Sequence, residues 1–163
     1  MTKPSQPAAD AVSPPGSETL EELWRREYPP MVRLARALVD SPDRAEEIVQ
    51  DAFAHTLRRW SSLERPGAYL RTSVVNGARS ELRKREVRRR VLPGRSPATT
   101  PAADEYLADA LAGLSPKRRI VLVLRYYADT PDDEIAELLG VRPATVRSLA
   151  ARGLSDLREV IER

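Results

Sequence analysis

The stretch of sequence that decides the fold is residues 130–158, TPDDEIAELLGVRPATVRSLAARGLSDLR. Its apolar residues recur at helical spacing on both sides of Gly140. Glycine is the residue that most readily takes the left-handed conformation in which a helix ends. Pro143 follows at a position typical of a first helical turn. The stretch therefore predicts two helices joined by a tight turn, with Ile135 and Val146 packed where the helices cross.

The second of these helices has an outer face that suits DNA. A helix–turn–helix unit places its second helix in the major groove, with the N-terminal half of that helix toward the bases. Arginine on such a face contacts phosphates or guanine edges. The alternative is an ordinary helical hairpin in an all-α protein. The residues that point away from the apolar stripe are Thr145, Arg147, Ser148, Ala151 and Arg152.

Two more helices are expected before this stretch, which gives a helical unit over residues 104–163. The first carries the apolar residues of 107–114 at helical spacing. The second runs from Pro116 to about Tyr127. Its apolar core, residues 120–124, could form a strand if taken alone, but Ser115 and Pro116 are typical of a helix start and favour a helix.

A first helical unit is predicted over residues 18–90. Helical periodicity begins at Leu20 and continues beyond Pro29 and Pro30. Ser41 and Pro42 begin a second helix, and Pro66-Gly67 precedes a third that runs from Ala68 to Leu82 and leads into an arginine-rich stretch. The apolar stripe of the second helix is Ile48, Val49, Ala52, Phe53, Leu57 and Trp60.

The two units are separated by a segment of different composition. Residues 91–103 (VLPGRSPATTPAA) are rich in proline, alanine and small polar residues and predict a flexible linker. Residues 1–17 have a similar composition and predict a disordered tail. The expected fold is therefore all-α, with two small helical domains joined by a linker and a helix–turn–helix in the C-terminal one.

The composition argues against catalysis. The chain of 163 residues contains no cysteine and one histidine, His55, which we expect on the surface of its helix. Disulfides, zinc ribbons and thiol nucleophiles are thereby excluded. We expect no catalytic residue, no cofactor and no metal site. Neither a secretion signal nor an apolar run of membrane-spanning length is present, so we expect a cytoplasmic binding protein.

Charge is distributed unevenly along the chain. Residues 79–95 carry a net charge of +6 and residues 140–163 a net charge of +2, whereas the segments that precede them are acidic. Basic segments attract the phosphate backbone of nucleic acids. In the helix before the first basic segment, Tyr69, Asn76, Arg79 and Arg83 combine an aromatic ring with polar and basic groups, as single-stranded nucleic acid requires. Alternatively, Tyr69 is a core residue and Asn76 an ordinary surface residue.

In their order and spacing, four segments resemble the regions of extracytoplasmic-function (ECF) sigma factors, the small two-domain members of the bacterial sigma-70 family. Residues 45–53 (AEEIVQDAF) are similar to region 2.2, and residues 65–79 (RPGAYLRTSVVNGAR) to regions 2.3 and 2.4. Residues 114–129 (LSPKRRIVLVLRYYAD) are similar to region 4.1, and residues 133–148 (DEIAELLGVRPATVRS) to region 4.2.

The resemblance implies a subunit that binds core RNA polymerase, through its beta and beta-prime subunits, and directs it to promoters. Loop 61–67 would receive an extruded base, and linker 91–103 would thread toward the RNA exit path. An anti-sigma factor is left open as a further partner. The resemblance assigns Glu47, Gln50 and Asp51 to polymerase binding, Tyr69, Asn76, Arg79 and Arg83 to the minus-ten element, and Arg142, Thr145, Arg147, Ser148, Ala151 and Arg152 to the minus-thirty-five element.

One departure from the family pattern concerns the start of the recognition helix. The family typically has serine where this chain has Arg142, so the helix loses a side-chain cap worth about 1 kcal/mol. Pro143 partly compensates by restricting the first turn. Two alternative functions stay open: a helix–turn–helix regulator that binds DNA alone as a dimer, and a sigma mimic that sequesters a regulator without binding DNA. The relative position of the two domains is also left open.

Overall fold

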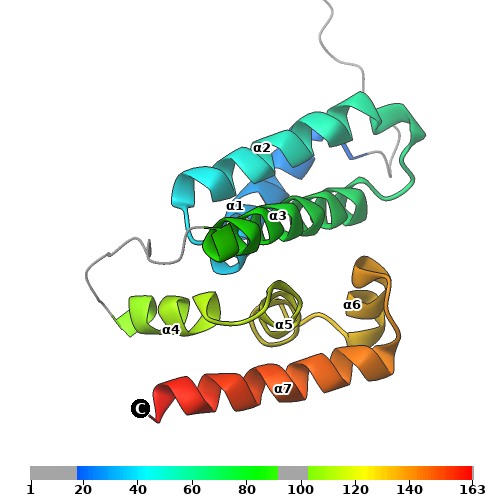
Figure 1. Cartoon of the computed structure of the whole chain (residues 1–163). Coiled ribbons are helices and arrows are strands. Elements are labelled where there is room, and N and C mark those ends of the chain that lie inside the picture. The colour runs from blue at the N-terminus through cyan, green and yellow to red at the C-terminus, as the bar shows by residue number, and fades with distance from the viewer. Residues whose placement is uncertain (1–17, 92–102, 163) are drawn as a thin grey trace, which may run out of the picture.

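The structure, a computed structural model, describes residues 18–91 and 103–162. The regular structure of these residues is entirely helical, as predicted (Figure 1). The predicted tail and residues 92–102 of the predicted linker lie outside the described residues. The elements are α1 (Leu20–Leu38), α2 (Pro42–Arg58), the 3-10 turn η1 (Trp60–Ser62), α3 (Pro66–Val91), α4 (Ala103–Ala112), α5 (Pro116–Leu122), the π-helical segment η2 (Val123–Tyr127), α6 (Asp132–Leu139) and α7 (Pro143–Ile161).

Local sequence explains where the helices of the first unit begin. At the start of α1, the hydroxyl of Thr19 accepts a hydrogen bond from the Glu22 N–H, and the Glu22 carboxylate accepts one from the Thr19 N–H. This reciprocal capping satisfies two donors that a helix start leaves unpaired. At the start of α2, the Ser41 hydroxyl accepts from the Arg44 N–H at 3.3 Å. These caps account for the predicted helix starts.

Helix α3 is longer than the sequence predicts. It extends from Pro66 to Val91, whereas the expected helix covers only residues 68–82. Proline is well suited to a first helical turn, so Pro66 begins the helix rather than preceding it. Beyond Leu82, ion pairs along the helix stabilise the arginine-rich turns, including Arg90–Glu86 at 2.9 Å. The first basic segment is therefore largely a helical surface.

The predicted apolar stripe of α2 is wrong at one position. Leu57 is 55% exposed, whereas its neighbour Thr56 is fully buried. Adjacent residues of a helix are turned by about 100° from each other, and here Thr56 is the one that faces inward. Trp60 is partly buried in η1. Aromatic residues of α1 and α2 form a cluster of their own. The Trp24 ring stacks on the Tyr28 ring with centroids 4.4 Å apart, and its centroid lies 4.5 Å from that of Phe53. This cluster covers one end of the contact between α1 and α2.

The apolar run 120–124 is helical, which confirms the prediction made from Ser115 and Pro116. Helix α5 carries it to Leu122 and continues into η2, where the N–H of Ala128 bonds to the carbonyl of Val123 at 3.0 Å. The segment ends at Tyr127, and Asp129, two residues further on, has a positive φ of 47°. Ile120 and Leu124 are fully buried. This helix is the centre of the second unit.

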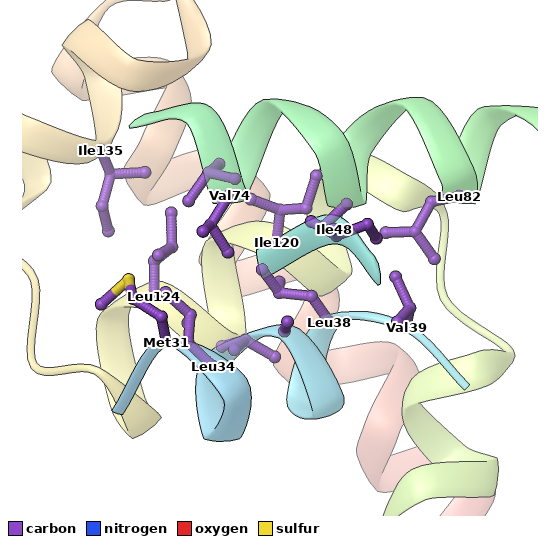
Figure 2. Packing of buried hydrophobic residues seen from close by; sticks show 14 of the residues in the cluster. Met31, Leu34, Leu38, Val39, Ile48, Val74, Leu82, Ile120, Leu124 and Ile135 are labelled. Atoms are coloured by element: carbon purple, nitrogen blue, oxygen red, sulfur yellow. The ribbon is translucent and has the colours of Figure 1, made fainter. Parts of the chain in front are cut away.

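The two units pack against each other, a point that the sequence leaves open. Helix α5 and η2 lie against α3 and α1, and the buried side chains of both units form one continuous apolar core. In Figure 2, Leu124 and Ile120 of the second unit lie among Met31, Leu34 and Val74 of the first. The structure is thus a closed arrangement of two helical units.

Candidate nucleic-acid interface

The turn between α6 and α7 has the predicted helix–turn–helix geometry. Gly140 takes the left-handed conformation with φ 63°. The Val141 N–H donates to the Ala136 carbonyl at 2.9 Å, and the Gly140 N–H donates to the Glu137 carbonyl at 3.2 Å. These two bonds close α6 and satisfy carbonyls that its end leaves unpaired. Helix α7 then begins at Pro143, as predicted from the sequence.

The outer face of α7 is free of contacts with the apolar core. Val146 and Ala150 are fully buried on the inner face, whereas Arg147 and Ser148 between them are exposed. The N-cap residue, Arg142, makes no side-chain capping bond. The accessible set comprises all six residues assigned to the minus-thirty-five element: Arg142, Thr145, Arg147, Ser148, Ala151 and Arg152.

We expect Gly140→Ala to destabilise the protein by about 1–2 kcal/mol, the cost of a left-handed conformation for a residue with a Cβ. A Cβ at this position meets no atom of the described part of the chain within 4 Å, so the cost is conformational rather than steric. Urea unfolding measures it. The control is Gly113→Ala, at an exposed glycine for which no left-handed φ is found. Equal effects of the two substitutions would contradict the assignment.

A second polar face follows α3. Its residues, Tyr69, Asn76, Arg79 and Arg83, are spaced by seven, three and four positions, which places them on one side of a helix. Asn76 and Arg83 are exposed, whereas Tyr69 and Arg79 are less so. The Arg59 guanidinium lies 5.9 Å from the centre of the Tyr69 ring, a cation–π distance. The four residues assigned to the minus-ten element therefore share one accessible face, so Tyr69 is not a fully buried core residue.

Gly77 determines which face of α3 turns outward. A Cβ at this position would lie 2.8 Å from Cγ2 of Ile48 on α2, closer than packed carbon atoms approach. Helices α2 and α3 therefore touch along the Gly77 side of α3. Asn76, one residue away, is directed off this contact. The close approach thus orients the polar face toward solvent.

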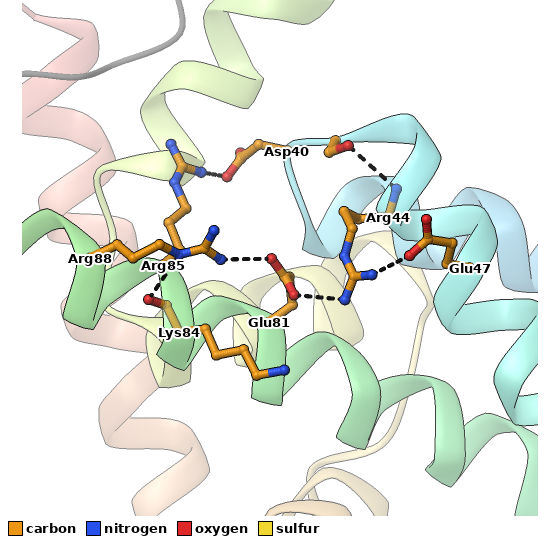
Figure 3. A network of polar contacts seen from close by, with 8 residues as sticks. Asp40, Arg44, Glu47, Glu81, Lys84, Arg85 and Arg88 are labelled. Atoms are coloured by element: carbon orange, nitrogen blue, oxygen red, sulfur yellow. Dashed lines mark hydrogen bonds and ion pairs between the residues drawn. The ribbon is translucent and has the colours of Figure 1, made fainter.

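An acidic surface covers the outer side of α2. The three residues assigned to polymerase binding, Glu47, Gln50 and Asp51, are all exposed. Arg44 pairs with Glu47 and bonds to Glu81 of α3 at 3.0 Å (Figure 3). The hydrogen bond with Glu81 and attraction to both carboxylates raise the pKa of Arg44. This pairing fixes α2 against α3 at the edge of the acidic surface.

Loop 61–67 connects these surfaces. It runs from the end of η1 into the first turn of α3, and Glu64 and Arg65 within it are exposed. A Cβ on Gly67 would lie 3.7 Å from Cδ1 of Leu23, so the loop end is held against α1. The loop therefore lies beside the Tyr69 end of the polar face of α3.

Sequence reasoning missed a set of charged residues between the two units. Arg119 is buried, with 2% of its surface exposed, and its Nη1 donates to Oδ1 of Asp40 at 2.8 Å. Arg71 of α3 bonds to Thr130 and lies 3.7 Å from Glu134 of α6. The partners are far apart in the chain. The one local signal in the sequence is Arg119, a charged residue directly before the apolar run 120–124.

Other kinds of site are not evident in the parts of the chain that the structure describes. Within residues 18–91 and 103–162, histidine, aspartate and glutamate do not gather in threes as a metal site would require. His55 is exposed, as predicted. The described helices include none of the length and apolarity needed to cross a membrane.

Taken together, the geometry defines a class: an all-α protein with a helix–turn–helix in one unit and a second polar helix face in the other. Comparison with known families agrees with both halves. Residues 23–88 match the family model described as Sigma-70 region 2, and residues 104–157 match Sigma-70, region 4.

Individual relatives extend the match over most of the chain. The RNA polymerase sigma-E factor of Streptomyces coelicolor is 38% identical over 149 residues, which cover 85% of this chain and 84% of that protein. The ECF RNA polymerase sigma factor SigE of Mycolicibacterium smegmatis is 29% identical, over 88% of this chain and 62% of its own length. The sigma factor RpoE from Bartonella quintana, crystallised with the anti-sigma factor NepR, has a similar fold with a TM-score of 0.71 at 24% identity, over 87% of this chain and 96% of that one.

The chain belongs to the sigma-70 family of RNA polymerase sigma factors, in its ECF group. It is a factor for promoter-specific transcription, as the resemblance of the four segments predicts. The stand-alone helix–turn–helix regulator is not favoured, because both sigma regions are present in order.

Proposed function

We propose that this chain is a transcription initiation factor that binds core RNA polymerase with α2 and reads a promoter with two separate helix faces. The observation that carries the proposal is the accessibility of the assigned residues on all three surfaces. Helix α7 contacts the duplex minus-thirty-five element, and α3 contacts the minus-ten element. The polymerase supplies the chemistry, in the cytoplasm, and the chain supplies the sequence preference.

Promoter melting follows from the chemistry of the α3 face. Extruding a base from the duplex costs a few kcal/mol, which stacking and hydrogen bonding outside the duplex offset. The Tyr69 ring supplies a stacking surface, and Asn76 supplies both a donor and an acceptor. Arg79 and Arg83 attract the backbone of the separated strand. Loop 61–67 lies next to Tyr69 and is the proposed place for an extruded base.

The acidic face of α2 suits a different partner. Glu47 and Asp51 repel nucleic acid, so this face is directed to protein, and the resemblance assigns it to the beta-prime clamp helices. The second unit is proposed to contact the beta subunit. The Bartonella quintana sigma factor was crystallised with an anti-sigma factor bound to it. We extend the same kind of partner to this chain without naming a particular one.

Run-off transcription with core polymerase on fragmented genomic DNA, with the start sites sequenced, tests the function. We expect discrete starts that share two upstream elements and that core polymerase alone does not produce. A chain that shifts the same DNA without polymerase and gives no transcript would instead be a stand-alone regulator. A chain that binds polymerase but gives no starts would be the sequestering mimic.

We expect the triple variant Glu47→Ala, Gln50→Ala, Asp51→Ala to lower affinity for core polymerase by about tenfold or more, because charged contacts at an interface act together. Exposed substitutions change stability by roughly 0.5 kcal/mol or less, so the melting temperature should hold. Co-purification with core polymerase measures the effect. The control, Glu159→Ala with Glu162→Ala, removes two exposed carboxylates elsewhere. Equal losses in variant and control would contradict the α2 assignment.

A further inference from the structure

Three charged residues lie together between the units, and we call them the Asp40 latch: Asp40, Arg85 and Arg119. Asp40 lies between α1 and α2. One of its carboxylate oxygens accepts from Arg119 of α5. The other pairs with Arg85 of α3 (Figure 3). Arg119 also donates to the carbonyl of Ala37 at 3.3 Å. Asp40 is thus the carboxylate that pairs both with α5 and with α3.

Arg119 is much more deeply buried than its partner Asp40. The Arg119 side chain is 3% exposed, whereas that of Asp40 is 25% exposed. Burial lowers the pKa of Arg119 to about 10, so the side chain is still charged at neutral pH. Among the residues that the structure describes, its Nε has no hydrogen-bond partner. A buried charge that loses its partner is strongly unfavourable, whereas an apolar side chain of similar size in its place is tolerated.

Arg85, the second partner of Asp40, is also affected by burial and by neighbouring arginines. Burial, and then the nearby charges of Arg119, Arg89 and Arg88, lower the pKa of Arg85. Two guanidinium groups, those of Arg85 and Arg119, therefore share the carboxylate of Asp40. The apolar core holds the units together, and the desolvation of Arg119 opposes this closure. The ion pair with Asp40 offsets this desolvation cost of Arg119.

The closed arrangement is too small to contact both promoter elements. A compact chain of this length has a radius of gyration of about 15 Å and a diameter of roughly 40 Å. Elements centred about 25 base pairs apart are separated by roughly 85 Å of duplex at about 3.4 Å per pair. The segment of residues 92–102 can extend at most about 40 Å, which allows the units to separate without breaking the chain.

We propose that the Asp40 latch holds the free chain in an autoinhibited closed state, which must open before α3 and α7 engage a promoter together. This inference rests on the proposed function for its biological consequence. The opening itself is a property of the free chain. When the units separate, Arg119 regains water, so the buried arginine favours opening, and Asp40 keeps the closed state in place.

Energy transfer between two dyes tests the latch without polymerase. The chain has no cysteine, so Ala54→Cys on α2 and Ser155→Cys on α7, both exposed, accept dyes selectively. We expect Asp40→Ala to raise the open-to-closed ratio on the order of ten- to a hundredfold and lower the transfer. Arg119→Met should keep the transfer at or above the wild-type level, because it removes the charge that favours opening.

These two variants are expected to move in opposite directions, which a folding defect does not do. The double variant Asp40→Ala with Arg119→Met should return to high transfer. Asp43→Ala, the same charge change three residues away, should leave it unchanged. Wild-type transfer in Asp40→Ala, or low transfer in both Arg119→Met and the double variant, would overturn the latch. A failure of wild-type chain to direct transcription would overturn the proposed function instead and leave these transfer values as they are.

Discussion

Replacing Arg147 and Arg152 with alanine together is expected to weaken promoter binding by on the order of a hundredfold or more, because each well-placed arginine contact with a base contributes about 1–3 kcal/mol. Both side chains are exposed on the outer face of α7. The inner face, with Val146 and Ala150, is left unchanged, and alanine is a good helix former. A gel shift of promoter DNA with the reconstituted polymerase complex measures the loss.

The control experiment separates recognition from folding. Core polymerase binding, measured by pull-down, should be unchanged in the Arg147→Ala, Arg152→Ala variant, since neither side chain is among the residues assigned to polymerase binding. Salt dependence gives a second readout: the slope of log affinity against log salt should fall by about one for each phosphate that the variant no longer neutralises. Arg158→Ala, an exposed arginine in the last turn of α7, is the matched variant. Matched losses in pull-down and gel shift would indicate misfolding.

Leu124→Ala is expected to lower the free energy of unfolding by about 2–5 kcal/mol, through lost burial and the cavity that it leaves. Leu124 is fully buried in η2, and its side chain lies beside Met31 of the first unit (Figure 2). For a chain of this size, each kcal/mol shifts the melting temperature by roughly 2–4 °C. Urea unfolding followed by circular dichroism measures the change.

Because Leu124 lies between the units, the same substitution also tests whether the two units unfold together. Because the apolar core is continuous, the wild type should unfold in one transition, and Leu124→Ala should shift the whole of it. Leu57→Ala, at the exposed leucine of α2, is the control and should change stability by about 0.5 kcal/mol or less. A loss below about 1 kcal/mol for Leu124→Ala would show that the core is not packed as described.

Local chemistry explains which parts of the fold can be predicted from the sequence. The turn at Gly140 and the start of α7 at Pro143 depend on neighbouring residues, so the sequence predicts them. The end of α3 is harder, because ion pairs such as Arg90–Glu86 extend a helix that lacks an apolar stripe there. The error at Leu57 arises since periodicity alone does not say which of two adjacent residues is turned inward.

Contacts between the units are beyond such reasoning. Asp40 and Arg119 are 79 positions apart, and nothing local to either residue indicates the other. Their pairing depends on how α5 packs against α1 and α3, which is a property of the assembled core. The assigned promoter residues are different in kind: the resemblance assigned them by motif, and the structure adds that they are accessible. Their roles stay predictions until the variants above are measured.

The close approach of Gly77 to Ile48 has a consequence for how the two positions can vary among related chains. Only hydrogen fits between α3 and the Cβ branch of Ile48. A relative with alanine at the position of Gly77 should therefore carry a residue unbranched at Cβ, such as leucine, at the position of Ile48. The two sites are expected to change as a pair, and an alignment of many sequences would reveal that coupling as covariation.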